Sequence, residues 1–538
     1  MPSREYAVDG DEGFIGLNSR DNPVILGKNF VSKAQNIRMD RGVATVRKGA
    51  ERLTVGALVG TPAYGSCSYT TAAGVELIVL VVNDGLYTFT PDTDTLSAKV
   101  NFPAGQTISS ADEVELYQAT GIGYVYILRG FSKSVLRWDG ATTIAIPGVS
   151  THTNYPDSRH AIYYGNRHIV QTDRNSISVS HYLSDATWSA LDVFTINDGS
   201  SDTLVAVTPW TLNEFVIFMR NSIFYAAAGV GANASGDAAQ EADSYIKSLA
   251  SDIGCIAKGS IVQAGGGILF LSDNGVYMLN PAGAGNGSAN TPEGMRLLTL
   301  AEPLSAPISD VIARINFAAV GKAVSAYWEN RYYLAVPLDN STVNNTVLVY
   351  NFLNRAWESV DTYNAAQAIE KFVVAKRGNR RRLFMVDKNE GVFLLEELDN
   401  DEFSASSPGV TGTPVLPFYI PATLTALSFP PITIAGELIT RAYTFQTNRE
   451  KRFASLQVDA AFTAGANLQT TFITVNPDFN TVINSYGSPL EEDVTLRLPV
   501  RKSGYYSQVK FNSINLRPSV RSVTVEAIVP GHMTQTRK

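Results

Sequence analysis

The feature that most constrains the fold of this chain is a hairpin pattern that recurs at intervals of about 45 residues. Each copy consists of two apolar segments joined by a polar turn rich in Asn, Asp or Gly, the residues that supply the positive φ of a tight turn between antiparallel strands. The pattern occurs at residues 76–90, 124–140, 167–180, 215–227, 267–280, 332–352 and 382–397. A four-stranded propeller blade holds two hairpins and uses about this length, so the spacing predicts a β-propeller.

The blade number follows only approximately from this pattern. The gaps between turn centres run from 41 residues (Lys133 to Arg174) to 71 residues (Asn274 to Asn345). Seven repeats favour seven blades, although six or eight are compatible with the longest gap, which can contain an insertion. The alternative is a set of unrelated hairpins in two or three sandwiches, which would give turn signals without a longer period.

The composition changes after Glu397 and suggests a second domain. Residues 400–414 are rich in Ser, Pro and Gly, as linkers are, and period-two strands return from about Gly436 to Val529. We expect an N-terminal arm (1–55), a propeller (56–399), a linker (400–435) and a C-terminal β-sandwich (436–538). Small and polar stretches predict insertions in the propeller near 228–251 and 281–325, with a short helix around Glu241–Leu249. The spacing of Ile308, Val311, Ile312 and Ile315 predicts the only substantial helix within Ser305–Tyr327.

Composition also excludes several classes of protein. Only 17% of the residues are charged, and 42 Gly, 24 Tyr and 24 Phe suit strands and tight turns better than long helices. The net charge of −7 disfavours a protein whose main role is to grip nucleic-acid phosphates. The longest apolar run, Leu77–Val82, is too short to cross a membrane, and residues 1–30 lack the order of a secretory signal. Cys67 and Cys255 are too few for a disulfide scaffold and are expected to be reduced.

No catalytic, metal-binding or cofactor-binding constellation is predicted, so we expect a protein that is not an enzyme. Four histidines fall in one window with spacings that match no common ligand pattern: His152, His160, His168 and His181. The turns in VNDGLYTF (82–89) and SDNGVYML (272–279) are similar to the Asp-box of sialidase propellers but lack its Thr-Trp pair. A glycan-binding or glycan-cleaving propeller that acts in host adsorption is therefore the alternative function.

The candidate interaction site is a strongly basic hairpin at residues 371–386. Five cations surround its Gly-Asn turn: Lys376, Arg377, Arg380, Arg381 and Arg382. They could contact DNA phosphates in transit or dock an acidic neighbour. A third interpretation is a solvated tip whose charge prevents edge-to-edge aggregation.

The first fifty residues resemble the opening of tail nozzle, or tail hub, proteins of short-tailed phages. That family opens with the phrases G-L-N-x-R-D-x-P, A-x-N-x-R and R-x-G, which stand here at Gly16–Pro23, Ala34–Arg38 and Arg47–Gly49. Weaker similarity extends to residues 124–140, 163–188 and 501–531. Gly16, Asn18, Asp21 and Pro23 are turn formers, and Asn36, Arg38 and Arg47 are expected to cap turns or pair locally.

The resemblance implies a structural protein of the virion tail, assembled in the host cytoplasm and not inserted in a membrane. It implies a β-propeller subunit of a homohexameric ring below the portal and the tail adaptor protein. That ring continues the channel for double-stranded DNA, anchors tail fibres or spikes, and takes part in genome ejection.

Overall fold

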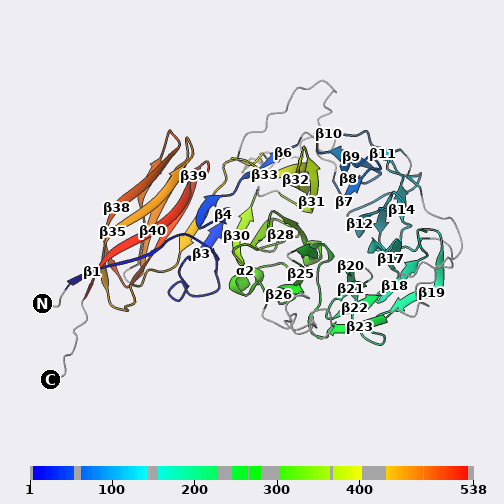
Figure 1. Ribbon diagram of the computed structural model, residues 1–538, viewed down its shortest axis with the longest axis horizontal. Helices are drawn as coiled ribbons and strands as arrows, with labels where there is room; N and C mark the ends of the chain where they lie inside the picture. Colours follow the sequence, from blue (N-terminus) through cyan, green and yellow to red (C-terminus); the bar gives the residue numbers. More distant parts are fainter. Residues whose placement is uncertain are drawn as a thin grey trace.

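The protein is all-β. A computed structural model describes residues 4–53, 62–142, 144–145, 155–211, 214–227, 245–264, 266–279, 303–363, 367–402, 432–475 and 478–530. These residues form strands β1 to β40 in eight sheets, with a few short helical turns (Figure 1). No helix in these ranges has the length and apolar character that a membrane span requires.

Seven successive groups of strands, here called ring sheets 1 to 7, lie around a common centre (Figure 1). Sheet 1 contains β7 (Gly65–Thr70), β8 (Glu76–Val82), β9 (Gly85–Thr90), β10 (Thr95–Leu96) and β11 (Val100–Asn101). Sheet 2 contains β12 (Val114–Ala119), β13 (Tyr124–Arg129), β14 (Leu136–Trp138) and β15 (Ile144–Ala145). Sheet 3 contains β16 (Ala161–Tyr164), β17 (Arg167–Gln171), β18 (Ser176–Ser180) and β19 (Trp188–Thr195).

The remaining ring sheets follow in chain order. Sheet 4 contains β20 (Leu204–Thr211), β21 (Glu214–Met219), β22 (Ile223–Ala227) and β23 (Tyr245–Ala250). Sheet 5 contains β24 (Val262–Ala264), β25 (Gly267–Ser272) and β26 (Gly275–Leu279). Sheet 6 contains β27 (Val324–Trp328), β28 (Arg331–Val336), β29 (Thr346–Asn351) and β30 (Ala356–Thr362). Sheet 7 contains β31 (Ile369–Arg377), β32 (Arg380–Asp387), β33 (Gly391–Leu398) and, from the N-terminal segment, β6 (Gly49–Arg52).

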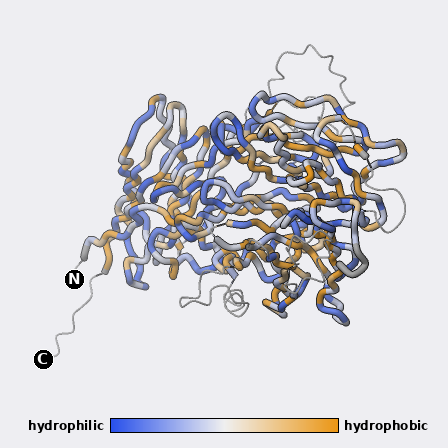
Figure 2. Tube along the Cα trace, turned by 45° about the vertical axis from the view of Figure 1, so that its right-hand side comes forward, coloured by the Kyte–Doolittle hydropathy of each residue, from blue (hydrophilic) through white to orange (hydrophobic). Residues whose placement is uncertain are grey.

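Each ring sheet is covered on both faces, which explains why its strands are apolar throughout. On β8, Ile78 and Leu80 enter the core shared with sheet 7, whereas Val79 and Val81 enter the core shared with sheet 2. Similar clusters of buried apolar residues join sheets 2 and 3, 3 and 4, 4 and 5, 5 and 6, and 6 and 7. Figure 2 shows the resulting apolar segments in the part of the molecule that holds these sheets. Because sheet 7 packs on sheet 1, the series of cores closes on itself.

The C-terminal unit consists of two further layers of sheet (Figure 1). Its outer sheet is six-stranded, with the order β38-β35-β40-β5-β4, and β1 pairs with β40. The other layer extends sheet 6 into a ten-stranded sheet, in which β30 is followed by β3, β34, β39, β36 and β37, while β2 pairs with β3. The bounds are β1 (Arg4–Asp11), β2 (Gly16–Leu17), β3 (Phe30–Gln35), β4 (Ile37–Asp40), β5 (Val43–Val46), β34 (Glu437–Thr440), β35 (Lys451–Phe462), β36 (Asn467–Val475), β37 (Phe479–Gly487), β38 (Glu492–Gly504), β39 (Tyr506–Asn515) and β40 (Ser519–Pro530).

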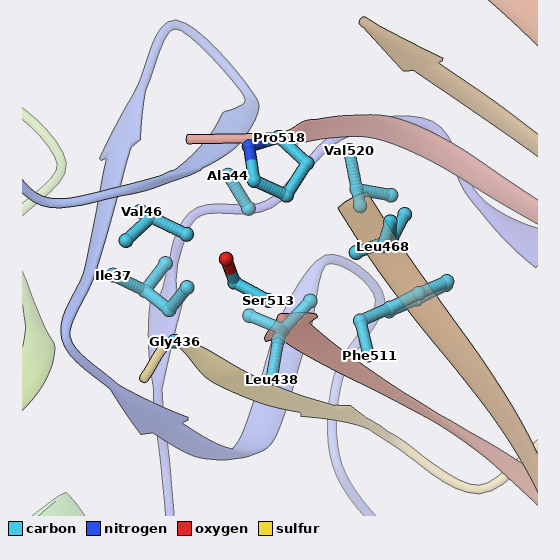
Figure 3. Close-up of a pocket in the computed structure, with 10 residues that line it drawn as sticks. All are labelled: Ile37, Ala44, Val46, Gly436, Leu438, Leu468, Phe511, Ser513, Pro518 and Val520. Atoms are coloured by element: carbon cyan, nitrogen blue, oxygen red, sulfur yellow. The ribbon is translucent and has the colours of Figure 1, made fainter. Parts of the chain in front are cut away.

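Strands of the C-terminal unit alternate, as expected for sheets with one face in a core and one in solvent. On β35, Leu456, Val458, Ala460 and Phe462 are buried at period two. Between the two layers lies a cavity of about 20 Å³ lined by ten residues, among them Ala44, Leu468 and Phe511 (Figure 3). This volume is about that of one water molecule.

The structure differs from the sequence-based expectation in the N-terminal arm. Residues 4–46 were expected to lead into the propeller, but their strands pair mainly with C-terminal strands, from Arg4 opposite Pro530 to Thr45 opposite Ser519. The described part of the segment 436–538 therefore builds its sheets together with the N-terminal strands. Among the described residues 4–53, only β6 is a strand of a ring sheet, while β3 pairs with β30 of sheet 6.

Two expected helices are also different. Tyr245–Ala250 is strand β23, paired with β22, because Leu249 and Ala250 are needed in the core between sheets 4 and 5. Within Ser305–Tyr327 the helical content is limited to three short turns: η3 (Ala306–Ile308), α2 (Ser309–Ile312) and η4 (Val320–Lys322). The expected insertions and linker fall largely at 228–244, 280–302 and 403–431, outside the described residues.

Candidate functional site

The basic hairpin is formed by β31 and β32 of sheet 7. Arg377 pairs with Arg380 across a turn in which Gly378 has φ +61°, a conformation that favours glycine. The same register places Lys376 opposite Arg381 and Ala375 opposite Arg382. The structure therefore gathers all five predicted cations at one hairpin end.

Carboxylates from sheet 1 and from β6 neutralise part of this charge. The Arg377 guanidinium lies 2.6 Å from Oδ2 of Asp94 and 3.3 Å from Oε2 of Glu51. The Gly378 N–H donates to Asp92 (2.5 Å), and the Lys376 N–H donates to Glu76 (3.0 Å), which also pairs with Arg381 (3.3 Å). The hairpin end is thus clamped onto sheet 1, across the boundary between the last and the first ring sheet.

The cations of the hairpin differ in their ion pairs and in their exposure to solvent. Arg382 pairs with Glu397 within sheet 7, and the Arg377 and Arg382 side chains are each only 25% exposed. Arg381 is 66% exposed, and its carbonyl accepts a hydrogen bond from the Trp328 indole. Within the described ranges, the side chains of Lys376 and Arg380 make no ion pair, and that of Arg381 makes only the exposed 3.3 Å pair with Glu76, so these three are the cations most accessible to a partner.

Two opposing effects act on the pKa of the Glu51 carboxyl. Its burial raises the pKa, and the Arg377 guanidinium lowers it, with a net pKa above the ordinary value. The clamp therefore uses charges that are partly removed from water, where ion pairs are stronger than on an open surface. Sequence reasoning found the five cations but not their acidic partners, which lie about 280 to 330 positions earlier.

Two of the three N-terminal phrases that carry the family resemblance, Ala34–Arg38 and Arg47–Gly49, contribute residues to a buried joint between sheet 6 and the C-terminal unit. Asn36 accepts from the Thr362 N–H (2.9 Å) and donates to the Ala435 carbonyl (2.9 Å). Arg38 is paired with Asp361 (2.6 Å) and with Glu396, and all three carboxylate and guanidinium groups are largely buried. These residues anchor the fold from the inside, as the turn-and-anchor interpretation of the phrase predicts.

Arg47 is the most connected of these anchors. Its side chain is fully buried and forms a two-pronged pair with Asp401 (2.9 and 2.6 Å). The guanidinium also donates to Asn36 (3.2 Å) and to the Thr362 carbonyl (3.1 Å), and it lies 3.9 Å from the centre of the Tyr363 ring. The Asp401 pair outweighs the burial penalty and raises the pKa of Arg47 above its already high ordinary value.

Side chains, rather than a regular ladder, join β30 to the segment that follows β3. Gln35 and Val360 are the one backbone pair between β3 and β30. Beyond it, the Ile37 N–H donates to the Ser359 hydroxyl (3.0 Å), and the Met39 N–H donates to the buried Glu358 carboxylate. Glu358 in turn pairs with Arg331 (2.7 Å). Buried acceptors therefore satisfy strand N–H groups that would otherwise be costly to bury.

The predicted histidine window does not form a metal site in the described part of the chain, where no group of three or more potential ligands is found. His168 lies in an aromatic cluster with Tyr117, Tyr126, Tyr155 and Trp188, and burial lowers its pKa to about 4. His181 lies in the connection between β18 and β19 of sheet 3, and His152 lies outside the described residues. His168 is accordingly a neutral core residue.

His160 belongs to a charged network at the centre of the ring sheets. Its Nδ1 lies 2.9 Å from the Glu115 carboxylate of β12, and its Nε2 accepts from the Val207 N–H of β20 (2.8 Å). Lys258, just before β24, donates to Glu115 (2.9 Å) and to the Arg159 carbonyl (2.7 Å). Burial alone would raise the pKa of Glu115, but His160 and Lys258 hold it well below its usual range.

This network crosses the middle of the ring. Glu115 belongs to sheet 2 and Lys258 to the entry of sheet 5, and these two sheets are not neighbours in the ring order. The first strands of the sheets, such as β7, β12, β16 and β20, also lie next to one another around this centre. The centre is therefore occupied by an ion pair and its hydrogen bonds.

A second, more open cavity lies at the C-terminal unit. It measures about 500 Å³ and has charges of both signs on its walls, with Glu491, Glu492 and Asp493 facing Arg517 and Arg521. Arg521 and Asp493 already pair with each other (2.8 Å). Arg517 pairs with Asp399, which does not line the cavity (3.7 Å).

Comparisons with known proteins find only weak similarity to solved structures. No family model and no curated protein matches the chain. Among solved structures, it is similar to the extracellular domain of a hybrid two-component system from B. thetaiotaomicron (10% identity, 65% of this chain and 39% of that chain, TM-score 0.40). It is also similar to BBS1N in complex with ARL6DN (13% identity, 66% and 98%, TM-score 0.38) and to a chain of the mitotic checkpoint complex (8% identity, 67% and 94%, TM-score 0.40). These similarities are too low in TM-score to bear on the fold or the function.

Proposed function

We propose that the seven ring sheets are the blades of a seven-bladed β-propeller and that the C-terminal unit is a β-sandwich. Support comes from the seven cores, each shared by two neighbouring sheets, and from the contact of sheet 7 with sheet 1. The addition of β6 to β33 supports it further, since propellers commonly close by joining strands from both ends of the chain in one blade.

The chain acts, in this proposal, as a structural subunit of a phage tail nozzle or hub. The observation that carries the proposal is the N-terminal resemblance at residues 14–53, together with the place of its key residues in the fold. Asn36, Arg38 and Arg47 connect the propeller to the sandwich, so the segment that resembles the family also holds the two parts of the subunit together. Its function is assembly and channel formation in the virion tail, with no turnover of a substrate.

The ring centre bears on the path that we propose for DNA. Because Lys258 and Glu115 bridge the middle of the propeller, double-stranded DNA passes between copies of the chain and not through one propeller. A closed ring of copies, six in this family, needs heterologous interfaces in which each copy presents different patches to its two neighbours. The net charge of −7 suits a wall along which DNA must slide without sticking.

The partners follow from this role. The tail adaptor protein lies on one side of the ring, and fibres or spikes attach to it. The accessible cations Lys376, Arg380 and Arg381 are the candidate contact for an acidic neighbour or for passing DNA.

Complementation of tail-deficient particles tests the function. Purified full-length chain is added to DNA-filled particles that carry the adaptor but lack this protein, and the product is examined by electron microscopy and by a DNA-delivery assay. We expect a six-fold ring at the adaptor and restored delivery.

Two results would count against the proposal. Absence of the chain from the adaptor end, with no gain in delivery, would remove the nozzle role. Binding of the isolated chain to host-surface glycans, without incorporation into particles, would favour the glycan-binding alternative.

A further inference from the structure

The N-terminal segment, residues 4–53, is here called the strap because it runs through both parts of the molecule. It enters as β1 along β40, continues as β2 and β3 in the ten-stranded sheet, and returns to the outer sheet as β4 and β5. Two residues after β5, it becomes β6, the last strand of sheet 7. One short segment thus completes the outer sheet of the C-terminal unit and the closing sheet of the ring.

Several arginine–carboxylate pairs hold the strap, among them those of Arg38 described above, and three others mark its start, middle and end. At its start, Arg441 pairs with Asp11 (2.8 Å) and Asp9 (2.7 Å), which lie on β1. At its end, Arg52 pairs with Glu390 (3.1 Å) of the turn before β33. The first pair joins the strap to the C-terminal unit alone, and the last joins it to the ring alone.

The middle pair, Arg47 with Asp401, has a different position. Arg47 lies between β5 and β6, and its partners come from the strap itself (Asn36), from the end of sheet 6 (Thr362, Tyr363) and from the segment after β33 (Asp401). Asp401 also accepts from the Ala50 N–H of β6 (2.9 Å). A displacement of β5 would therefore move a buried charge that β6 and sheet 7 depend on.

We propose that the strap couples closure of the ring to formation of the C-terminal unit, and that Arg47 is the residue through which the coupling passes. The physical reason is the cost of the uncoupled state. If either part opens and carries Arg47 or Asp401 with it, the other is left as a buried charge without its partner, which is strongly unfavourable. Opening both parts together avoids this state, so the two parts open as one cooperative unit.

Hydrogen exchange in a double-mutant cycle tests this coupling. Four full-length proteins are compared: wild type, Arg441→Lys, Arg47→Lys and the double variant. Lysine keeps the charge but loses the planar fork of the guanidinium. Amides of β40 report on the C-terminal unit and amides of β32 report on the ring.

In the wild-type background, we expect Arg441→Lys to accelerate exchange about 5- to 30-fold in both β40 and β32, although Arg441 touches only the C-terminal unit. In the Arg47→Lys background, the same change should accelerate β40 alone. Arg521→Lys is the matched control, because Arg521 forms an exposed pair with Asp493 on the outer sheet and should alter neither reporter.

The coupling is refuted if Arg441→Lys leaves β32 unchanged in the wild-type background. It is equally refuted if β32 still responds to Arg441→Lys when Arg47 has been replaced. Should Arg47→Lys not fold, Arg47→Met with Asp401→Leu serves in its place, since it removes both buried charges of the pair and leaves neither without a partner.

Discussion

Glu370 on β31 provides a quantitative test of how a buried carboxyl in a ring sheet affects stability. Burial raises the pKa of this carboxyl from 4.5 to about 7, and Lys388, Lys371 and Lys322 lower it only in part. Its carboxylate is therefore destabilising in the folded protein at neutral pH. Replacement by glutamine keeps the size of the side chain and removes the charge, so Glu370→Gln should stabilise the fold above pH 7.

The sign and size follow from proton linkage. Between pH 4.5 and about 7, the folded state binds more protons at Glu370 than the unfolded state, so the free energy of unfolding of the wild type falls as pH rises. At about 1.36 kcal/mol per pKa unit, the loss is at most about 3.4 kcal/mol. Because the side chain is not completely buried, we expect about 1.5 to 3 kcal/mol.

Urea unfolding of both proteins at intervals from pH 4 to 8.5 measures this directly. The two free energies of unfolding should agree below pH 4.5, and the variant should gain progressively until about pH 7.5 and then stay ahead by a constant amount. Glu491→Gln, at an exposed glutamate, is the control and should show no such gain. A difference that does not change with pH, or a variant that is less stable at pH 8, would refute the account of Glu370.

Three other predictions concern the hairpin, the closing strand and the cysteines. Lys376→Glu with Arg380→Glu should change the free energy of unfolding by no more than about 0.5 kcal/mol but impair incorporation into particles. Arg377→Gln should lower the midpoint of urea unfolding, because it leaves Asp94 and Glu51 without their cation. Normal incorporation of the double variant would leave only the solvated-tip interpretation. Gly49→Ala should prevent the pairing of β6 with β33 in sheet 7, because a Cβ at position 49 overlaps the Asn400 backbone, and fast proteolysis of β33 would detect this. Gly74→Ala is the control: its Cβ meets no neighbour, so it should lower the free energy of unfolding by only about 1 kcal/mol. Cys67 and Cys255 are free and buried, with pKa values raised to about 12 and about 11, so both should react with iodoacetamide only after unfolding; rapid labelling of the native protein would contradict this.

Local sequence patterns predict most of the strands but not their long-range partners. The run Leu77–Val82 and the turn after it locate β8 and β9, because tight turns and buried strands leave signals within a few residues. Nothing local to Arg4–Asp11 indicates that its partner is β40, and β6 cannot be assigned to sheet 7 from four residues. The mistaken helix at Glu241–Leu249 has the same origin, since tertiary pairing with β22 overrides a helix-compatible composition.

The candidate site shows the same division. The five cations stand out in the sequence, and the prediction that Asn36, Arg38 and Arg47 act as anchors agrees with their burial. The acidic residues that clamp the hairpin could not be singled out, because Glu51, Glu76, Asp92 and Asp94 are ordinary turn and strand residues in the sequence. Only the packing of sheet 7 on sheet 1 brings them to the cations.

The pairing of the two chain ends also sets the order of events during synthesis. Asp11 pairs with Val523, 512 positions later, and Arg52 of β6 pairs with Phe393, which is also synthesised much later. At about 5–20 residues per second, the ribosome takes roughly 25 to 100 seconds to deliver the partner of β1. During that time β1 exposes an unpaired edge that carries Tyr6 and Val8, both more than 60% solvent-accessible even in the finished fold. The edge of β1 is therefore a site where nascent chains can pair with one another before β40 is synthesised.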